Sequence, residues 1–277
     1  NSEKNIIGGE ASVTEFAGEQ VSYKKVYTGP IPPGKTAEIE VPIPRVYGRN
    51  IKDIKYEIHL EDGTVYDLST TANFAFAPFA ATPPVIDGVW SKNEWADNTS
   101  FEANQKSQIK QITDWGGADD LSAVIYTAWD YENFYITARV KDDVFCLKDV
   151  GQLIWQGDSI QFGLVYGEET NIQIGNFGTK YSEFGAAKTS EGDQMYRWMS
   201  EDDSKPAGAV DNYQLAITRD EDACLTTYEM AVPWSEILPK NFAEFDPNRV
   251  LGFSMLVNDN DGNGRRGWIE YASGIGE

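Results

Sequence analysis

Short stretches in which hydrophobic and polar residues alternate occur along most of this chain, and glycine, proline and acidic residues separate them. A period of two puts every second side chain on the same face of a strand, so the pattern predicts β-strands rather than helices. In the first 80 residues it predicts a hairpin turn at 61–64 and strands at 21–27, 37–41, 54–60 and 65–68. We expect this part to fold as a small immunoglobulin-like β-sandwich that acts as a spacer or packing module.

After about residue 83 the same pattern continues over a longer region. It predicts strands at 121–129, 134–140, 159–165, 213–218, 226–232 and 251–257. Ser91 and Glu94 have the spacing of a capping box, which predicts a short helix that buries Trp95, and residues 233–237 predict one helical turn. The alternation is frequent but imperfect, as expected where two sheets pack face to face.

Small residues and paired prolines at 80–84 predict a stiff, exposed joint between the two regions. The predicted fold class is therefore all-β, with two β-sandwich domains at 1–82 and 83–277. The composition agrees, because 41% hydrophobic and 13% aromatic residues suffice for a core and favour strands. No apolar run of 18 residues is present, so we expect no membrane-spanning segment.

The strongly negative charge of the chain excludes some classes of partner. The formal net charge is −21, from 23 basic and 44 acidic residues. Such a surface repels phosphate groups and no local Lys/Arg cluster offsets it, so we expect neither nucleic acid nor membrane as a partner. Neutral ligands and divalent cations are compatible with this charge. The two cysteines, Cys146 and Cys224, either pair or remain as thiols, and the sequence leaves both alternatives open.

Histidine and cysteine, on which many nucleophilic mechanisms depend, are scarce in this chain. The only histidine, His59, lies in a predicted strand of the first domain, away from either cysteine in sequence. This excludes Ser-His-Asp and Cys-His nucleophilic schemes and any His-based zinc site. Carboxylates are abundant, but none stands in a motif that resembles a glycosidase motif, so we expect the chain to be non-catalytic.

A calcium-loop pattern lies near the C-terminal end. Asp259, Asp261, Asn263, Gly264 and Glu270 satisfy the spacing D-x-[DN]-x-[DN]-G-x₅-E, in which alternate oxygen ligands can surround a hard cation. The flanking residues have strand patterns rather than the helical patterns of an EF-hand, and a polar hairpin tip uses the same residue types. The pattern therefore has two interpretations, a Ca²⁺ site or a turn.

Four motifs occur in one order after the predicted joint: Val-Ile-Asp-Gly with two tryptophans at 85–95, Trp-Asp at 129–130 followed by Phe-Tyr-Ile-Thr-Ala at 134–138, Trp-Gln-Gly-Asp-Ser at 155–159, and Leu-Gly-Phe at 251–253 running into Asp-Asn-Asp-Gly at 259–262. Together they resemble the family 9 carbohydrate-binding modules, which are β-sandwich appendages of secreted xylanases and related glycan-degrading enzymes. The resemblance covers the second domain only. It implies a β-sandwich fold, a secreted or cell-surface protein, and a structural Ca²⁺ ion as the one expected cofactor.

The resemblance also implies where a sugar would bind. In that family the Trp of the Trp-x-x-Asp-Ser motif is one of two tryptophans that sandwich a terminal sugar, which points to Trp155, with Asp158 from the same motif. The sugar-binding members carry a glutamate and an arginine where this chain has Gln161 and, in a rough alignment, Gln173. An amide pair donates and accepts hydrogen bonds without charge assistance. The second tryptophan is expected in a segment beyond the last residue of this sequence, so we expect millimolar binding or none.

Two functions follow from these observations. The first is a non-catalytic carbohydrate-binding module of a larger polysaccharide-degrading protein, which binds xylan or glucan chains or chain ends by aromatic stacking. Its partners would be a polysaccharide or oligosaccharide and the other domains of the parent protein. The alternative is a structural or interaction module that packs against a neighbouring catalytic domain and binds no sugar of its own. The exposure of Trp155 distinguishes the two, because a buried indole cannot stack on a sugar ring.

Overall fold

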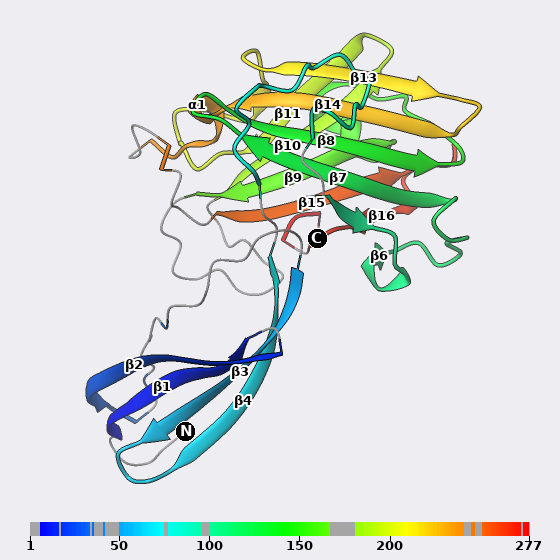
Figure 1. Cartoon of the computed structure of the whole chain (residues 1–277). Coiled ribbons are helices and arrows are strands. Elements are labelled where there is room, and N and C mark those ends of the chain that lie inside the picture. Colours follow the sequence, from blue (N-terminus) through cyan, green and yellow to red (C-terminus); the bar gives the residue numbers. More distant parts are fainter. Residues whose placement is uncertain are drawn as a thin grey trace. The chain divides into compact units, whose positions relative to one another are not determined.

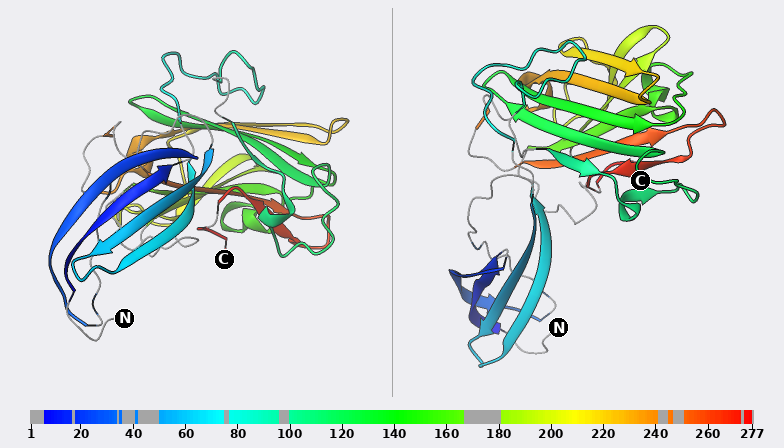
Figure 2. Two further views of the ribbon diagram at one scale, coloured as in Figure 1. Left: turned by 60° about the horizontal axis from the view of Figure 1, so that its bottom comes forward. Right: turned by 45° about the vertical axis from the view of Figure 1, so that its right-hand side comes forward.

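The chain divides into two compact units, Asn1–Phe76 and Ala77–Glu277, which are described separately (Figures 1 and 2). The division comes before the predicted end of the first domain at residue 82, because residues 77–80 bond to Trp129 of the second unit. Trp129 Nε1 donates to Ala77 O at 2.9 Å, and Ala80 N donates to Trp129 O at 2.7 Å. The computed structural model of the chain describes residues 6–16, 18–33, 35, 41, 50–74, 77–95, 100–166, 181–240, 245–246, 251–272 and 274–276.

The first unit contains one antiparallel sheet of four strands in the order β2-β1-β3-β4. Its strands are β1 (Ile6–Phe16), β2 (Glu19–Ile31), β3 (Asn50–Leu60) and β4 (Val65–Phe74). The predicted strands at 21–27, 54–60 and 65–68 fall within β2, β3 and β4, and the sequence pattern did not identify β1. The predicted strand at 37–41 lies outside the described residues except for Val41. The described residues form a single layer here, so the immunoglobulin-like sandwich stays a prediction.

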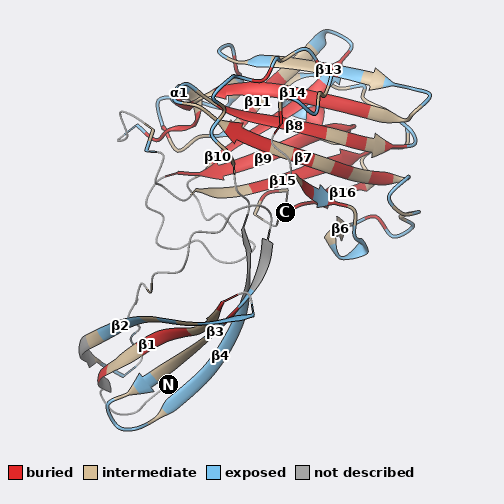
Figure 3. Cartoon of the chain, in the orientation of Figure 1, coloured by how far each residue is buried: buried red, intermediate tan, exposed pale blue. Residues whose placement is uncertain are grey.

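The predicted hairpin turn between β3 and β4 is confirmed. Gly63 has φ 88°, a conformation that glycine adopts without steric cost, and its N–H donates to Leu60 O at 3.0 Å. A small apolar cluster, with Val13, Phe16 and Ile54 buried, covers one side of the sheet. Much of the remaining surface of this unit is half-buried or exposed (Figure 3).

The second unit is a sandwich of two antiparallel sheets that lie face to face (Figures 1 and 2). One sheet has seven strands in the order β12-β11-β10-β9-β15-β16-β6, and the other has five in the order β13-β14-β8-β7-β5. The strands are β5 (Phe101–Ala103), β6 (Ile109–Lys110), β7 (Leu121–Trp129), β8 (Asn133–Asp142), β9 (Ser159–Val165), β10 (Ser182–Thr189), β11 (Gly192–Met199), β12 (Gly208–Ala209), β13 (Gln214–Asp220), β14 (Leu225–Pro233), β15 (Gly252–Asp259) and β16 (Gly267–Glu270).

All six strands predicted for this region are confirmed, and each overlaps β7, β8, β9, β13, β14 or β15. The predicted helical turn is α1 (Trp234–Ile237), and two 3₁₀ turns occur at η1 (Lys106–Gln108) and η2 (Gly151–Gln156). The short helix predicted after Ser91 is wrong for the residues described there. They form a single turn in which Glu94 N donates to Ser91 O at 3.1 Å, because a capping box needs a longer apolar-periodic run to continue as a helix.

The core lies between the two sheets (Figure 3). On β9, Ile160, Phe162 and Leu164 point into it, and the strand's pleat turns Ser159 and Gln161 to the opposite face, away from the five-stranded sheet. We call that opposite side of the seven-stranded sheet the outer face. A second small cluster of Val165, Leu256, Trp268 and Ile275 covers part of it. The outer face therefore carries polar side chains next to an apolar patch.

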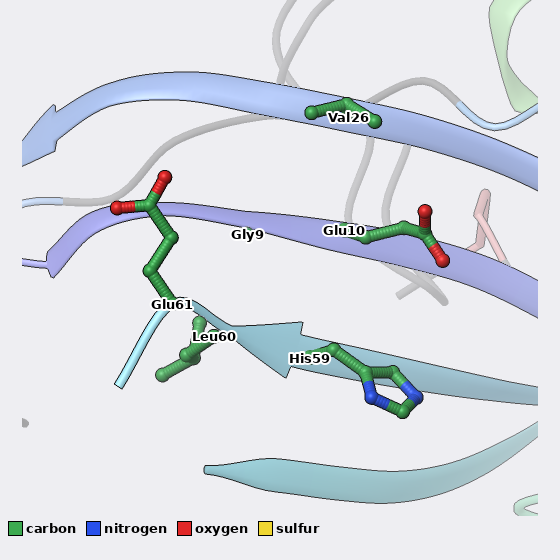
Figure 4. A pocket seen from close by; sticks show the side chains of 6 residues that line it. All are labelled: Gly9, Glu10, Val26, His59, Leu60 and Glu61. Carbon is green, nitrogen blue, oxygen red and sulfur yellow. The ribbon is translucent and has the colours of Figure 1, made fainter. Parts of the chain in front are cut away.

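Three further features of the described residues do not indicate a binding or catalytic site. Cys146 and Cys224 are both free thiols, so they do not pair. No helix among the described residues is long and apolar enough to cross a bilayer. Figure 4 shows a pocket of about 260 Å³ on the sheet of the first unit, with Glu10, His59 and Glu61 among the residues that line it. His59 bonds to Glu57 at 2.7 Å, and no residue with a predicted binding role belongs to this pocket.

We expect Phe162→Ala to lower the free energy of unfolding of the second unit by about 3–5 kcal/mol. Phe162 is fully buried and its ring stacks on that of Phe184 with 5.2 Å between centroids, so the substitution leaves a cavity in the middle of the core. Phe79→Ala is the matched control, because Phe79 is 48% exposed and its loss removes little buried area. Chemical denaturation of both variants measures the difference, and an equal effect of the two would contradict this account of the core.

Candidate functional site

Trp155 lies in the 3₁₀ turn η2, which leads directly into β9. Two glycines fix this turn. Gly151 opens it with φ 60°, and Gly157 closes it against Leu147 and the carbonyl of Cys146, where a Cβ atom would come within 2.7 Å of that carbonyl oxygen. The indole of Trp155 is half-buried. The Trp-Gln-Gly-Asp-Ser motif thus places an indole, partly accessible, at the end of the outer face.

A set of polar side chains, which we call the amide network, lies on the outer face beside this turn. Asn258 Nδ2 donates to Ser159 Oγ at 3.0 Å and to Gln161 Oε1 at 2.9 Å. Gln161 Nε2 in turn donates to Glu183 Oε1 at 2.9 Å. All four side chains are buried, and the desolvation of its carboxylate raises the pKa of Glu183 above its usual value. Each member therefore orients the next across β15, β9 and β10.

Arg265 links the amide network to two tryptophans. Its Nε donates to Asn258 Oδ1 at 2.9 Å, and its guanidinium carbon lies over the rings of Trp155 and Trp268, 5.4 and 4.3 Å from their centroids. Burial alone lowers the pKa of this guanidinium to about 10. Trp268 is held from its other end, because its Nε1 donates to Glu270 Oε2 at 3.0 Å. The outer face thus carries a positive group between aromatic rings.

The predicted carbohydrate-binding residues occupy different environments. Trp155 lies at the outer face and is partly accessible, and Gln161 lies on the same face within the amide network, with its amide nitrogen and its amide oxygen each in a hydrogen bond. Gln173 lies outside the described residues. Asp158 is 3% exposed, and its two oxygens accept hydrogen bonds from the backbone N–H groups of Cys146 and Asn260, so it is not presented to a ligand at the outer face.

Asp158 instead belongs to a buried acidic cluster with Asp142 and Asp259, which we call the acidic cluster. One carboxylate oxygen from each lies within 4.8 Å of the others. Asp142 and Asp259 are the last residues of β8 and β15, and Asp158 directly precedes β9, so the cluster bridges the two sheets at one end of the sandwich. Asp142 and Asp259 are 2% and 0% exposed.

The electrostatics of the acidic cluster are unfavourable for three ionised carboxylates. Burial, followed by the charges of neighbouring aspartates, raises the pKa of Asp142 to about 6 and that of Asp158 to about 9. Burial likewise raises the pKa of Asp259 to about 7, although Arg266 opposes this shift. Arg266 Nη1 is 3.0 Å from Asp259 Oδ2, yet neither oxygen of Asp259 accepts a hydrogen bond. Oδ1 of Asp259 is therefore a buried acceptor without a donor, and Oδ2 is contacted by Arg266 through an ion pair.

The predicted calcium-loop residues are only partly brought together. Asp259 belongs to the acidic cluster, and Asp261 lies next to it, with a carboxylate oxygen within 4.8 Å of Asp142 and Asp143. Asn263 is exposed at the hairpin tip. Glu270 lies on the outer face, on the opposite side of the sheet from the acidic cluster, and pairs with Lys110 at 3.2 Å. The pleat of β16 excludes Glu270 from a site around Asp259, which the linear spacing does not reveal.

Sequence reasoning missed the residues that complete both groups. Asn258 precedes the calcium-loop pattern, Arg265 occupies one of its unspecified positions, and neither has a motif of its own. Glu183 and Asp142 lie on other strands. The alternation on β15 and β9 is the one signal that could have found Asn258, because a polar residue at every second position of a buried strand indicates a second, functional face.

Comparison with known proteins matches residues 85–274 to the family described as "Carbohydrate family 9 binding domain-like". The chain is 25% identical over 276 residues to Endo-1,4-beta-xylanase A of Thermotoga neapolitana, and 25% identical over 274 residues to the Thermotoga maritima protein of the same name. Each match covers 91% of this chain and 23% of the relative, so the chain spans about a quarter of the length of these relatives.

Similar solved structures include two of family 9 carbohydrate binding modules from Caldicellulosiruptor kristjanssonii. The one in complex with cellotriose has a TM-score of 0.47 at 15% identity, covering 71% of this chain and 82% of that one. The one in complex with glucose has a TM-score of 0.40 at 21% identity, covering 70% of this chain and 84% of that one.

We expect Asn258→Leu to destabilise the second unit and to release the side chains that it orients. Leucine has the same number of side-chain heavy atoms as asparagine but cannot bond to Gln161 Oε1 or Arg265 Nε, at a cost of about 1–3 kcal/mol for each group left without a partner. Asn104→Leu is the control, since Asn104 is only half-buried and bonds in an exposed loop. Thermal melts and the indole N–H signal of Trp155 in a ¹H–¹⁵N spectrum report the change, and a Tm equal to that of the control would contradict the role given to Asn258.

Proposed function

This chain belongs to the carbohydrate family 9 binding domain-like proteins, and on that premise we propose that its second unit binds a polysaccharide chain or chain end by stacking a sugar ring on Trp155. In this proposal the chain is a non-catalytic module of a longer secreted or cell-surface protein that degrades polysaccharide. The relatives that it matches are xylanases about four times its length, so catalysis in the whole protein would belong to other segments.

The position of Trp155 is the observation that carries the proposal. A pyranose ring presents C–H groups on its faces, and an indole that is partly accessible offers a flat apolar surface for them. Trp155 is half-buried at the end of a polar face, with Asn258, Gln161 and Arg265 within one hydrogen-bonded set beside it. A ligand site of this kind needs an aromatic platform together with a few fixed polar groups.

The ligand class follows from the relatives and from the polar groups. Endo-1,4-beta-xylanases act on xylan, so xylo-oligosaccharides are the first candidates and cello-oligosaccharides the second. The amides of Gln161 and Asn258 already bond to each other and to neighbours, which leaves few free hydrogen-bonding groups for sugar hydroxyls. We therefore expect affinities in the millimolar range.

We expect Trp155→Ala to abolish the binding of xylo- and cello-oligosaccharides measured by isothermal titration. Stacking on an aromatic side chain contributes about 0.5–1.5 kcal/mol beyond the buried area, which is enough to remove a weak interaction. Trp90→Ala is the matched control, because Trp90 is also half-buried with an arginine over its ring, Arg139 at 4.8 Å, but lies in another apolar cluster of the same unit.

The outcomes separate the two functions. Binding that Trp155→Ala abolishes and Trp90→Ala preserves supports the sugar-binding module. Absence of heat at millimolar sugar in the folded wild-type chain would instead favour a module that packs against a neighbouring domain. Circular dichroism of each variant confirms that the sandwich is intact.

We also propose that the acidic cluster holds a structural Ca²⁺ ion. The donors fit this ion, since Asp142, Asp158 and Asp259 offer oxygens only, and the two oxygens of Asp259 are buried and accept no hydrogen bond. The local arginines do not balance the charge. Arg219 lies 3.7 Å from Asp142 and Arg266 is shared among several aspartates. A bound Ca²⁺ ion would offset the negative charge of the three carboxylates and connect the ends of the two sheets.

Calcium is expected to raise the melting temperature of the second unit relative to the chain in EDTA. A ligand at a hundred times its Kd stabilises the folded state by about 2.7 kcal/mol. Asp259→Asn should abolish the calcium-dependent shift and should itself raise the melting temperature in EDTA, because it removes a buried charge. Asp211→Asn, an exposed acid elsewhere, should retain the shift. An unchanged shift in Asp259→Asn would place the ion elsewhere.

A further inference from the structure

Two consecutive arginines of the second unit, Arg265 and Arg266, differ in the ion pairs that they form. Arg266 forms ion pairs with four carboxylates, those of Asp114, Asp120, Asp259 and Asp261, at 2.6–3.2 Å. Arg265, the preceding residue, forms none with any described carboxylate, and burial is the sole influence on its pKa. The chain carries 44 acidic residues against 23 basic ones, so this lack of a partner does not reflect a shortage of carboxylates.

The guanidinium of Arg265 is fixed in place but incompletely satisfied. Nε donates to Asn258 Oδ1 at 2.9 Å, and Asn258 is itself held by Ser159 and Gln161. Nη2 is buried and has no hydrogen-bond partner. Removing a charged donor from water without a partner is unfavourable, and it is rare in folded proteins outside functional positions. Among the described residues, the guanidinium of Arg265 therefore has no carboxylate partner.

We propose that the sugar bound at the outer face carries a carboxylate, as a hexuronic acid residue does, and that this carboxylate pairs with Arg265 while the pyranose ring lies against Trp155. This inference rests on the proposed function and names its ligand class. A terminal guanidinium edge presents two parallel N–H groups, which match the two oxygens of a carboxylate. Because Nε is bonded to Asn258 and Nη2 is buried, the carboxylate reaches the Nη edge only after the side chains that cover Nη2 move aside.

The remaining charges on the outer face are compatible with an arriving anion. Glu270 is paired with Lys110 at 3.2 Å and accepts a hydrogen bond from the Trp268 indole. Glu183 is buried at the far end of the amide network and accepts a hydrogen bond from Gln161, and Tyr181 also bonds to it. Two amide side chains thus stand between Glu183 and Arg265, and the guanidinium is the charged group of this set that lacks a partner.

The test compares one sugar in a charged and an uncharged form. Wild-type chain at neutral pH is titrated by NMR with methyl glucuronoside, with the methyl ester of the same compound, and with methyl glucoside. We expect the carboxylate to bind about tenfold or more tightly than its ester, the gain typical of a hydrogen bond to a charged group. In Arg265→Gln the ratio of the two affinities should fall to about one.

Arg139→Gln is the control, because Arg139 also lies over a tryptophan, Trp90, in the same unit and should leave the ratio unchanged. Thermal melts of Arg265→Gln show whether the variant folds, and we expect at most a small loss of Tm without ligand, because the glutamine amide can replace Nε as the donor to Asn258. Equal affinity of the wild type for the acid, the ester and the glucoside, with binding still dependent on Trp155, would overturn this inference alone. Absence of binding by all three would overturn the proposed function together with it.

Discussion

The antiparallel pairing of β9 with β15 is the constraint on which the rest of the second unit depends. It places Ser159 opposite Asn258 and Gln161 opposite Leu256, so two polar side chains of β9 meet one polar side chain of β15 on the outer face. The same pairing turns Phe162 and Met255 toward the core. A slip of one residue would exchange the two faces, burying the polar side chains between the sheets. The core and the candidate site therefore share one register.

The strands of the second unit were predictable from sequence because their alternation is local. The apolar positions of 121–129 and 159–165 recur at a period of two, and the structure places both strands within those bounds. The predicted helix after Ser91 failed because a cap without a following apolar repeat specifies only a turn. β1 went unpredicted, since its alternation is interrupted by two glycines and its stability comes from pairing with β2 and β3.

The sequence identified Trp155 among the residues of the candidate site, but not the side chains that surround it. Trp155 was identified from the contiguous motif Trp-Gln-Gly-Asp-Ser at 155–159, which can be recognised directly in the sequence. Asp158, from the same motif, contributes to the acidic cluster rather than to the outer face, because the pleat points it inward. Arg265, Asn258 and Glu183 come together only when β15 and β10 flank β9, and no spacing along the chain records such a contact.

Two electrostatic features of the second unit, the acidic cluster and Arg265, are the basis for the ligands proposed above. The acidic cluster concentrates negative charge where arginines do not balance it, and Arg265 carries positive charge without an acid. The two lie on opposite sides of the seven-stranded sheet, with Arg266 directed to the first and Arg265 to the second. Consecutive arginines in an extended segment point to opposite sides, so one short hairpin can serve both groups.

Indole N–H signals give the most direct measurement of the central claim, that sugar binds against Trp155 on the outer face. The chain has eight tryptophans, each with one such signal in a ¹H–¹⁵N spectrum. On titration with xylo-oligosaccharide, the account predicts that the signals of Trp155 and Trp268 shift together and saturate, while that of Trp90 stays in place. Saturating shifts at Trp90 with none at Trp155, or no shift at any indole at millimolar sugar, would contradict it.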